Sequence, residues 1–222
     1  MKSTVPVLII LTFLCSCGVY YPHQVDVPLI SSKHNIKIDA GVSLTQEAGI
    51  NVAYGLTNKV AIQAYASKSH DNTYYLQFAP GYYKKLGKNK ILEYYLGYGT
   101  GSGYLYFDPN PGDFSGKYQL YFVQADLGKA NRESALVDFG IGLKAGLLSS
   151  KMIDDNYYAQ VSSGTYNDKS LVLEPQAVIK IGGQHFRVSI KGGLCFLYKF
   201  TNMGKRFPYF PYNLGTGLNI NF

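Results

Sequence analysis

Apolar side chains return at every second position over much of this chain, in segments of about ten residues. The first segment sets Ile36, Ile38, Ala40, Val42 and Leu44 against Lys37, Asp39, Gly41 and Ser43. A period of two places all apolar side chains of a strand on one face. The opposite face of these segments carries mainly Gly, Asn, Ser and charged residues. The chain therefore has to form strands whose two faces meet different surroundings.

Ten segments follow this pattern, and most approach the roughly 9–11 residues that a tilted strand needs to cross a bilayer. They cover residues 36–44, 48–56, 60–67, 73–83, 91–99, 118–127, 134–147, 170–181, 185–199 and 212–222. This pattern predicts an all-β fold over residues 35–222. The expected form is a closed, antiparallel, up-and-down transmembrane β-barrel of about ten strands, within a range of about eight to ten. A soluble sandwich or lipocalin-like barrel also alternates, but its strands are shorter.

The connections between these segments also alternate in kind. Connections 45–46, 68–72, 100–117, 148–169 and 200–210 include all the long ones, whereas 57–59, 84–90, 128–133 and 182–184 are short. Membrane barrels have short periplasmic turns and longer extracellular loops. We therefore expect both ends of the barrel to be periplasmic and loops 100–117 and 148–169 to be extracellular. Tyrosines near the segment ends, in a chain without Trp, are expected to lie at the membrane interfaces.

The first 34 residues differ from the rest. Lys2 and the apolar run Val5–Leu14 resemble a signal peptide, too short to span a bilayer as a helix. Leu14-Cys15-Ser16-Cys17 resembles a bacterial lipobox, which implies a signal peptide over 1–16 and lipidation of Cys17. The alternative is an ordinary signal peptide cleaved near Ser16 or Gly18. Prolines in residues 17–34 predict an extended conformation. Together with the lipobox, they make residues 17–34 an expected lipidated N-terminal tether.

The other end of the chain carries a second specific pattern. Leu218 and Ile220 alternate back from the final aromatic residue Phe222. This ending resembles the terminal strand signal that the barrel-assembly machinery recognises. With the lipobox at Cys17 and strands such as Gly81-Tyr82-Tyr83, it resembles outer-membrane β-barrel lipoproteins of Bacteroidota-type bacteria. The resemblance implies a Gram-negative outer membrane as the location and its lipids and assembly machinery as partners. It implies no catalytic residue.

Charged side chains on the polar face are expected to line the barrel lumen. In a narrow lumen such charges must pair or stay hydrated. We expect a rigid, ion-paired interior, and the alternative is a charge-lined path for small ions or solutes. The lumen set is Asp39, Glu93, Asp126, Asp138, Lys144, Glu174, Lys180, Arg187, Lys191 and Lys199.

Two arrangements contain the residue types of a catalytic triad. Ser69-His70-Asp71 lies in an expected extracellular loop, but three consecutive residues seldom supply the hydrogen-bonded chain of a triad. His185 with Ser189 and Glu174 is the second candidate, and we expect His185 and Ser189 to face opposite ways on one strand. We therefore assign no catalytic residue.

The remaining patterns predict no cofactor and no metal. Asp154-Asp155 lacks the spacing of a calcium loop. The formal charge of +7 is spread along the chain, which argues against nucleic acid. Cys195 stands alone outside the leader, so no disulfide framework is expected. The sequence leaves the oligomeric state open.

The preferred function is that of a non-enzymatic, lipid-anchored outer-membrane barrel with a structural or surface role. A narrow pore or transporter is the first alternative. A soluble periplasmic lipoprotein of barrel or sandwich type that binds a small ligand is the second, and a lipid-modifying enzyme is the third. Outward-pointing Ile50 and Phe139 would favour the membrane barrel over a sandwich.

Overall fold

The computed structural model describes Tyr20, His23 and residues 27–69, 73–105, 113–130, 137–155, 164–200 and 209–222. Every assigned element in this part of the chain is a strand, and no helix there is long and apolar enough to cross a membrane. The strands are β1 (Ile36–Ser43), β2 (Ala48–Gly55), β3 (Val60–Lys68), β4 (Tyr74–Lys85), β5 (Lys90–Leu105), β6 (Asp113–Lys129), β7 (Val137–Asp155), β8 (Gly164–Gly182), β9 (Phe186–Leu194), β10 (Phe196–Lys199) and β11 (Tyr212–Asn221).

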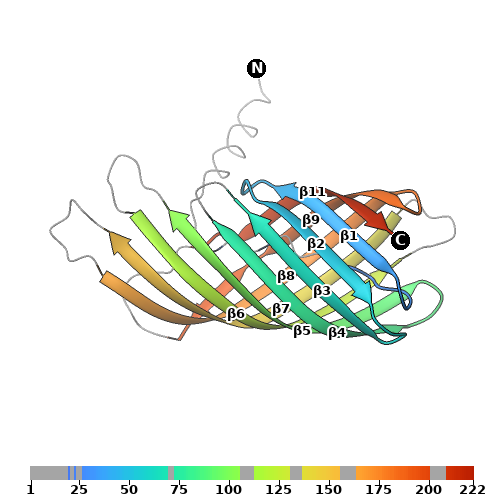
Figure 1. Ribbon diagram of the computed structural model, residues 1–222, viewed down its shortest axis with the longest axis horizontal. Coiled ribbons are helices and arrows are strands. Elements are labelled where there is room, and N and C mark those ends of the chain that lie inside the picture. The colour runs from blue at the N-terminus through green and yellow to red at the C-terminus, as the bar shows by residue number, and fades with distance from the viewer. Residues whose placement is uncertain are drawn as a thin grey trace, which may run out of the picture.

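The sheet closes on itself (Figure 1). Each strand from β1 to β8 pairs antiparallel with the next, and β11 pairs with β1, with Ala40 opposite Leu218. β9 and β10 pair with β8 in one register, with Ile190 opposite Ile179 and Phe196 opposite Leu173. They are two parts of one strand interrupted at Cys195, so the eleven assigned strands form a closed barrel of ten. The predicted fold class is confirmed.

The apolar face of every strand points out of the barrel. Ile50 and Phe139 are 45% and 48% exposed, and no second sheet covers them in the described residues. The β-sandwich alternative is therefore wrong. We call these outward side chains the apolar belt, represented strand by strand from β1 to β11 by Val42, Ile50, Val60, Phe78, Leu96, Val123, Phe139, Leu171, Ile190, Phe196 and Leu218, all more than a third exposed.

The two ends of the barrel differ in their connections. The turns after β2, β4 and β8 are short and lie at one end, together with residues 31–35 and the C-terminus, where Phe222 and Ile36 exchange backbone hydrogen bonds. We call this the short-turn end and the opposite one the long-loop end. Leu218 and Phe222 of the expected assembly signal are exposed on the outer face, and Ile220, with the same parity, is half-buried.

Strands β5–β8 are longer than the sequence predicts, with 16 to 19 residues each. They reach beyond the other strands at the left of Figure 1, so much of the expected loops 100–117 and 148–169 is strand and that prediction was wrong. The cause is that the apolar belt ends at Tyr121, Leu147 and Leu171, whereas hydrogen-bonded pairing continues beyond it. Alternation of apolar and polar residues could not reveal strands that are polar on their outer face.

Candidate functional site

The N-terminal segment, expected only as a tether, lies inside the barrel in its described residues. Tyr20, Val27 and Ile30 are fully buried, and Leu29 is 1% exposed. At the short-turn end the backbone N–H of His34 donates to Gly55 O. At the long-loop end Tyr20 pairs with Tyr209, next to the start of β11. The segment therefore crosses the lumen from one mouth to the other, and we call Tyr20, His23 and residues 27–31 the lumen segment.

Glu93 of β5 holds the middle of the lumen segment by its backbone. The N–H groups of Leu29 and Ile30 donate to Glu93 Oε2 and Oε1 at 2.9 and 2.6 Å. Leu29 has a φ of +57°, a left-handed conformation that costs a non-glycine residue about 1–2 kcal/mol. That conformation brings two consecutive N–H groups onto one carboxylate, an arrangement suited to an anion. Charge-assisted hydrogen bonds of this kind are about twice as strong as neutral ones, which offsets the local strain.

A second backbone contact and two glycines fix the same stretch. Lys180 Nζ of β8 donates to Val27 O at 3.0 Å. A Cβ on Gly128 would lie 2.5 Å from Leu29 Cδ2, and one on Gly140 would lie 2.7 Å from Val27 Cγ1. Glycine is therefore required at these points for the lumen segment to approach the barrel wall.

His23 anchors the other half of the lumen segment among tyrosines near the long-loop end. Its ring stacks on Tyr75 with centroids 3.5 Å apart, and its Nε2 lies 3.1 Å from Tyr118 Oη. Its Nδ1 lies 3.1 Å from Glu47 Oε1, in the loop between β1 and β2. Burial alone would raise the pKa of the Glu47 carboxyl. Hydrogen bonds, above all from His23, together with the charge of that ring, hold this pKa below its ordinary value.

Tyr20 closes the lumen next to this cluster. Its hydroxyl donates to Glu174 Oε1 at 2.8 Å, and its backbone oxygen accepts from the N–H of Phe210 at 2.9 Å. A cavity of about 20 Å³ beside His23 and Lys191 has room for about one water molecule. The lumen at this level is filled by protein.

The expected lumen charges are almost all buried inside the barrel. Lys191 pairs with Asp39 and Arg187 with Asp138, while Lys144 Nζ lies 3.7 Å from Glu174 Oε2. Only Lys199 stands apart: it is half-buried at the long-loop end and lies 3.4 Å from Asp168. The other nine expected lumen charges are each at most 5% exposed: Asp39, Glu93, Asp126, Asp138, Lys144, Glu174, Lys180, Arg187 and Lys191.

Sequence reasoning missed several parts of this interior. Lys37 of β1 is 3% exposed, and its opposite parity to Ile36 and Ile38 was the available signal. Tyr65, Tyr75 and Tyr118 are also buried in the lumen, although tyrosines were expected mainly at the membrane interfaces. Their room comes partly from glycines of β5, since a Cβ on Gly99 would lie 2.1 Å from Tyr75 Oη and one on Gly101 would lie 2.6 Å from Tyr118.

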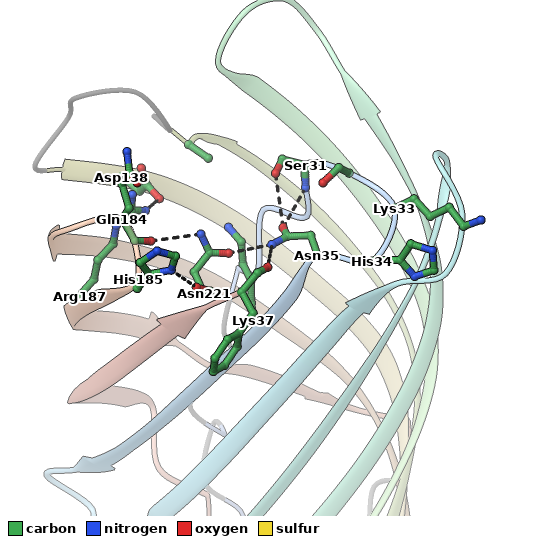
Figure 2. Close-up of a pocket in the computed structure, with 13 residues that line it drawn as sticks. Ser31, Lys33, His34, Asn35, Lys37, Asp138, Gln184, His185, Arg187 and Asn221 are labelled. Atoms are coloured by element: carbon green, nitrogen blue, oxygen red, sulfur yellow. Dashed lines mark hydrogen bonds and ion pairs between the residues drawn. The ribbon is translucent and has the colours of Figure 1, made fainter.

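The short-turn mouth holds a half-open cavity of about 370 Å³ (Figure 2). Figure 2 shows Asn35 at its centre, with Nδ2 donating to Asn221 Oδ1 and to Phe222 O, both at 2.8 Å. These contacts tie the end of the lumen segment to the end of the chain. Arg187 and Asp138 line the opposite wall.

Neither catalytic candidate is assembled in the described residues. Ser69 Oγ donates to Thr45 O and Gln46 O, while His70 and Asp71 lie outside the described residues. His185 and Ser189 share one parity, so the expectation of opposite faces was wrong. They nevertheless have different surroundings: exposed His185 contacts Asn221 O at the short-turn mouth, whereas Ser189 is fully buried.

The structure shows no metal-ligand cluster in its described part, and the predicted lipidation site lies outside that part. Among the described residues, no three His, Cys, Asp or Glu side chains are placed to hold a metal ion. Asp154 and Asp155 belong to β7 by backbone pairing, and their side chains lie outside the described part. Cys17 also lies outside the described residues, and Cys195 is a buried free thiol.

Comparison with known proteins adds one structural likeness. No protein-family model and no curated protein matches the chain. The fold is similar to the N-terminal β-barrel domain of Pseudomonas aeruginosa OprF, with 13% sequence identity and a TM-score of 0.37, over 86% of this chain and 98% of that domain. A likeness of this size assigns neither a function nor a location.

Removing the Glu93 carboxylate is expected to release the lumen segment. In Glu93→Ala the amides of Leu29 and Ile30 lose a charge-assisted acceptor, so their hydrogen exchange should accelerate by roughly tenfold or more. Glu93→Gln keeps one acceptor oxygen, so its exchange rates at Leu29 and Ile30 should lie between those of the wild type and those of Glu93→Ala. Exchange measured by mass spectrometry tests this. Asp168→Ala, at the long-loop end, is the control, and unchanged exchange in Glu93→Ala would contradict the role given to this carboxylate.

Proposed function

We propose that the protein is a non-enzymatic outer-membrane β-barrel, lipid-anchored at Cys17 and closed by its own N-terminal segment, with a structural role at the cell surface. The observation that carries the proposal is the apolar belt. Leu96, Ile190 and Phe139 are 66%, 54% and 48% exposed on different strands. Soluble monomers rarely expose continuous apolar surface of this extent, whereas acyl chains would solvate it.

Backbone pairing is consistent with this environment. Lipid cannot satisfy exposed N–H and C=O groups, so a sheet that crosses a bilayer has to close. The β1–β11 pairing provides that closure. The outward Leu218 and Phe222 lie on β11 or at its end, where the assembly machinery would meet them. A soluble periplasmic lipoprotein would leave the same belt in water.

The filled lumen favours a closed barrel over the pore alternative. Ion pairs, the tyrosine cluster and the lumen segment occupy the interior between the two mouths. A barrel of about eight strands is already filled by its own side chains, and ten strands add room for one extended chain.

Conductance in planar bilayers tests the closed lumen. The wild-type protein should show no stepwise conductance, whereas deletion of residues 19–31 should open a path and give discrete steps. Gly183→Ala controls for the effects of mutation and reconstitution and should not conduct, because a Cβ on Gly183 would have its nearest neighbour, Phe186 O, at 3.9 Å. Conductance of the wild type would overturn the closed barrel. If neither the wild type nor the deletion variant conducts, the lumen segment is not what closes the barrel.

The lumen segment also bears on where the anchor lies. Tyr20 is three residues after Cys17, so the two Cα atoms are separated by at most about 10 Å. Tyr20 lies at the long-loop end, and long loops are extracellular in membrane barrels. We therefore place the lipid on Cys17 on the extracellular side. The sequence alone left the leaflet of the anchor open, and in this topology the two ends of the barrel remain on the periplasmic side that the loop lengths predict.

Cysteine pairs test this topology in a Cys195→Ser background. Tyr20→Cys with Tyr209→Cys should form a disulfide, because residues in a β-bridge have suitable Cα separation. Tyr20→Cys with Thr57→Cys, at the short-turn end, should not.

An impermeant maleimide on intact cells should label Thr45→Cys and leave Thr57→Cys unlabelled, and Cys17→Ala should abolish metabolic acyl labelling. A Tyr20–Thr57 crosslink, reversed maleimide labelling or acyl labelling that persists would each contradict the topology or the anchor.

A further inference from the structure

Beyond the apolar belt, the outer face of β5–β8 carries a group of lysines without acidic neighbours among the side chains that the structure describes. Lys117 of β6 lies directly opposite Lys151 of β7, and both are exposed. Lys169 of β8 pairs with Ser149, which places it diagonally beside Lys151. Opposite residues on paired strands have Cβ atoms about 5 Å apart, and diagonal ones about 7–8 Å. The described outward side chains around them are Thr100, Ser102, Tyr104, Ser115, Gln119, Ser149, Ile153, Thr165 and Asn167.

Like charges placed directly opposite each other destabilise a sheet. In the lumen, Lys144 and Lys191 lie beside carboxylates, so the chain supplies acidic partners where it buries these two charges. On the outer face, Lys117 and Lys151 have no ion pair among the described residues. An anion between the two ammonium groups would convert this repulsion into attraction.

The same two lysines line a hollow on the outer face. It has a volume of about 570 Å³, and its wall includes Tyr104, Ser102, Ser115 and Ile153. Gly103 and Gly116 also line it. The hollow is therefore lined by two ammonium groups, three hydroxyl-bearing side chains and apolar surface.

The position of the lysines along the barrel axis, relative to the apolar belt, indicates which kind of anion would bind there. Lys117 and Lys151 are each four residues beyond the last belt residues, Tyr121 and Leu147. Four residues of a tilted strand rise about 10 Å, and lysine side chains reach back toward the interface. A ligand held there would set its charge against the lysines and its acyl chains against the belt.

We propose that Lys117 and Lys151, assisted by Lys169, form a binding site for the phosphorylated headgroup of the glycolipid in the outer leaflet. The proposal rests on the membrane location proposed above. Lysines near a membrane surface attract anionic lipid, so two of them at one headgroup are expected to strengthen binding by roughly tenfold or more.

Photocrosslinking in intact Gram-negative cells tests the site. A photoreactive amino acid at Gln119, which is outward-facing and two residues from Lys117, should form a covalent adduct with lipid A, detected by mass spectrometry. Lys117→Gln with Lys151→Gln should lower the adduct yield roughly tenfold. The matched control is Lys90→Gln with Lys129→Gln, the opposing lysine pair of β5 and β6 at the short-turn end, which should leave the yield unchanged.

A second arm separates the lipid from free phosphate. For the purified protein, lipid A with both phosphates should bind tighter than dephosphorylated lipid A, and excess inorganic phosphate should compete weakly because it lacks acyl chains. Strong competition by inorganic phosphate would reduce the site to a simple anion site. An adduct to another protein, or a yield that Lys117→Gln with Lys151→Gln leaves unchanged, would overturn the proposal. Absence of the wild-type protein from outer-membrane fractions would instead contradict the proposed function.

Discussion

The whole structure depends on which way the apolar face of each strand points. In a soluble β-protein that face meets a second layer of protein, but here it faces out of the barrel on every strand. The polar face then has to occupy the interior, where an isolated charge is costly. The pairs Lys191–Asp39, Arg187–Asp138 and Lys144–Glu174 follow from that requirement. Closure between β1 and β11 follows as well, because an open edge would leave backbone groups unpaired.

The interior is completed by the chain that precedes the first strand. Glu93 illustrates how this works: its two oxygens take consecutive N–H groups of Leu29 and Ile30, so a buried carboxylate and an extended chain satisfy each other. Farther along, His23 inserts between aromatic rings and reaches Glu47. The same contacts that satisfy buried polar groups also fill the lumen.

The sequence allowed the barrel, its strand order and its lumen charges to be predicted, because each of these depends on a period of two. The outward position of Ile50 and Phe139 follows from parity alone. The polar extensions of β5–β8 did not follow, since beyond Leu147 and Leu171 the described outward side chains are mostly polar and give no alternation of apolar and polar residues. Alternation marks the extent of the apolar belt rather than the extent of the strand.

The lumen segment was equally hidden from sequence reasoning. Its burial depends on Gly128 and Gly140, which lie about a hundred residues away along the chain and meet it only in the folded barrel. Residues 20–31 have no periodicity, and their prolines indicate only an extended conformation. Nothing in such a stretch distinguishes an external tether from a chain held inside. The lysine pair at 117 and 151 became visible only through strand register.

The most direct test of this account is the environment of the belt. Single nitroxide labels at Phe139 and Leu143, and at Ser149 and Lys151 farther along the same strand, can be compared after reconstitution into liposomes in a Cys195→Ser background. Collision rates with oxygen and with a water-soluble nickel chelate report lipid and water respectively. The account predicts high oxygen and low nickel accessibility at Phe139 and Leu143, and the reverse at Ser149 and Lys151. High nickel accessibility at all four positions would mean that water, and not acyl chains, covers the apolar face.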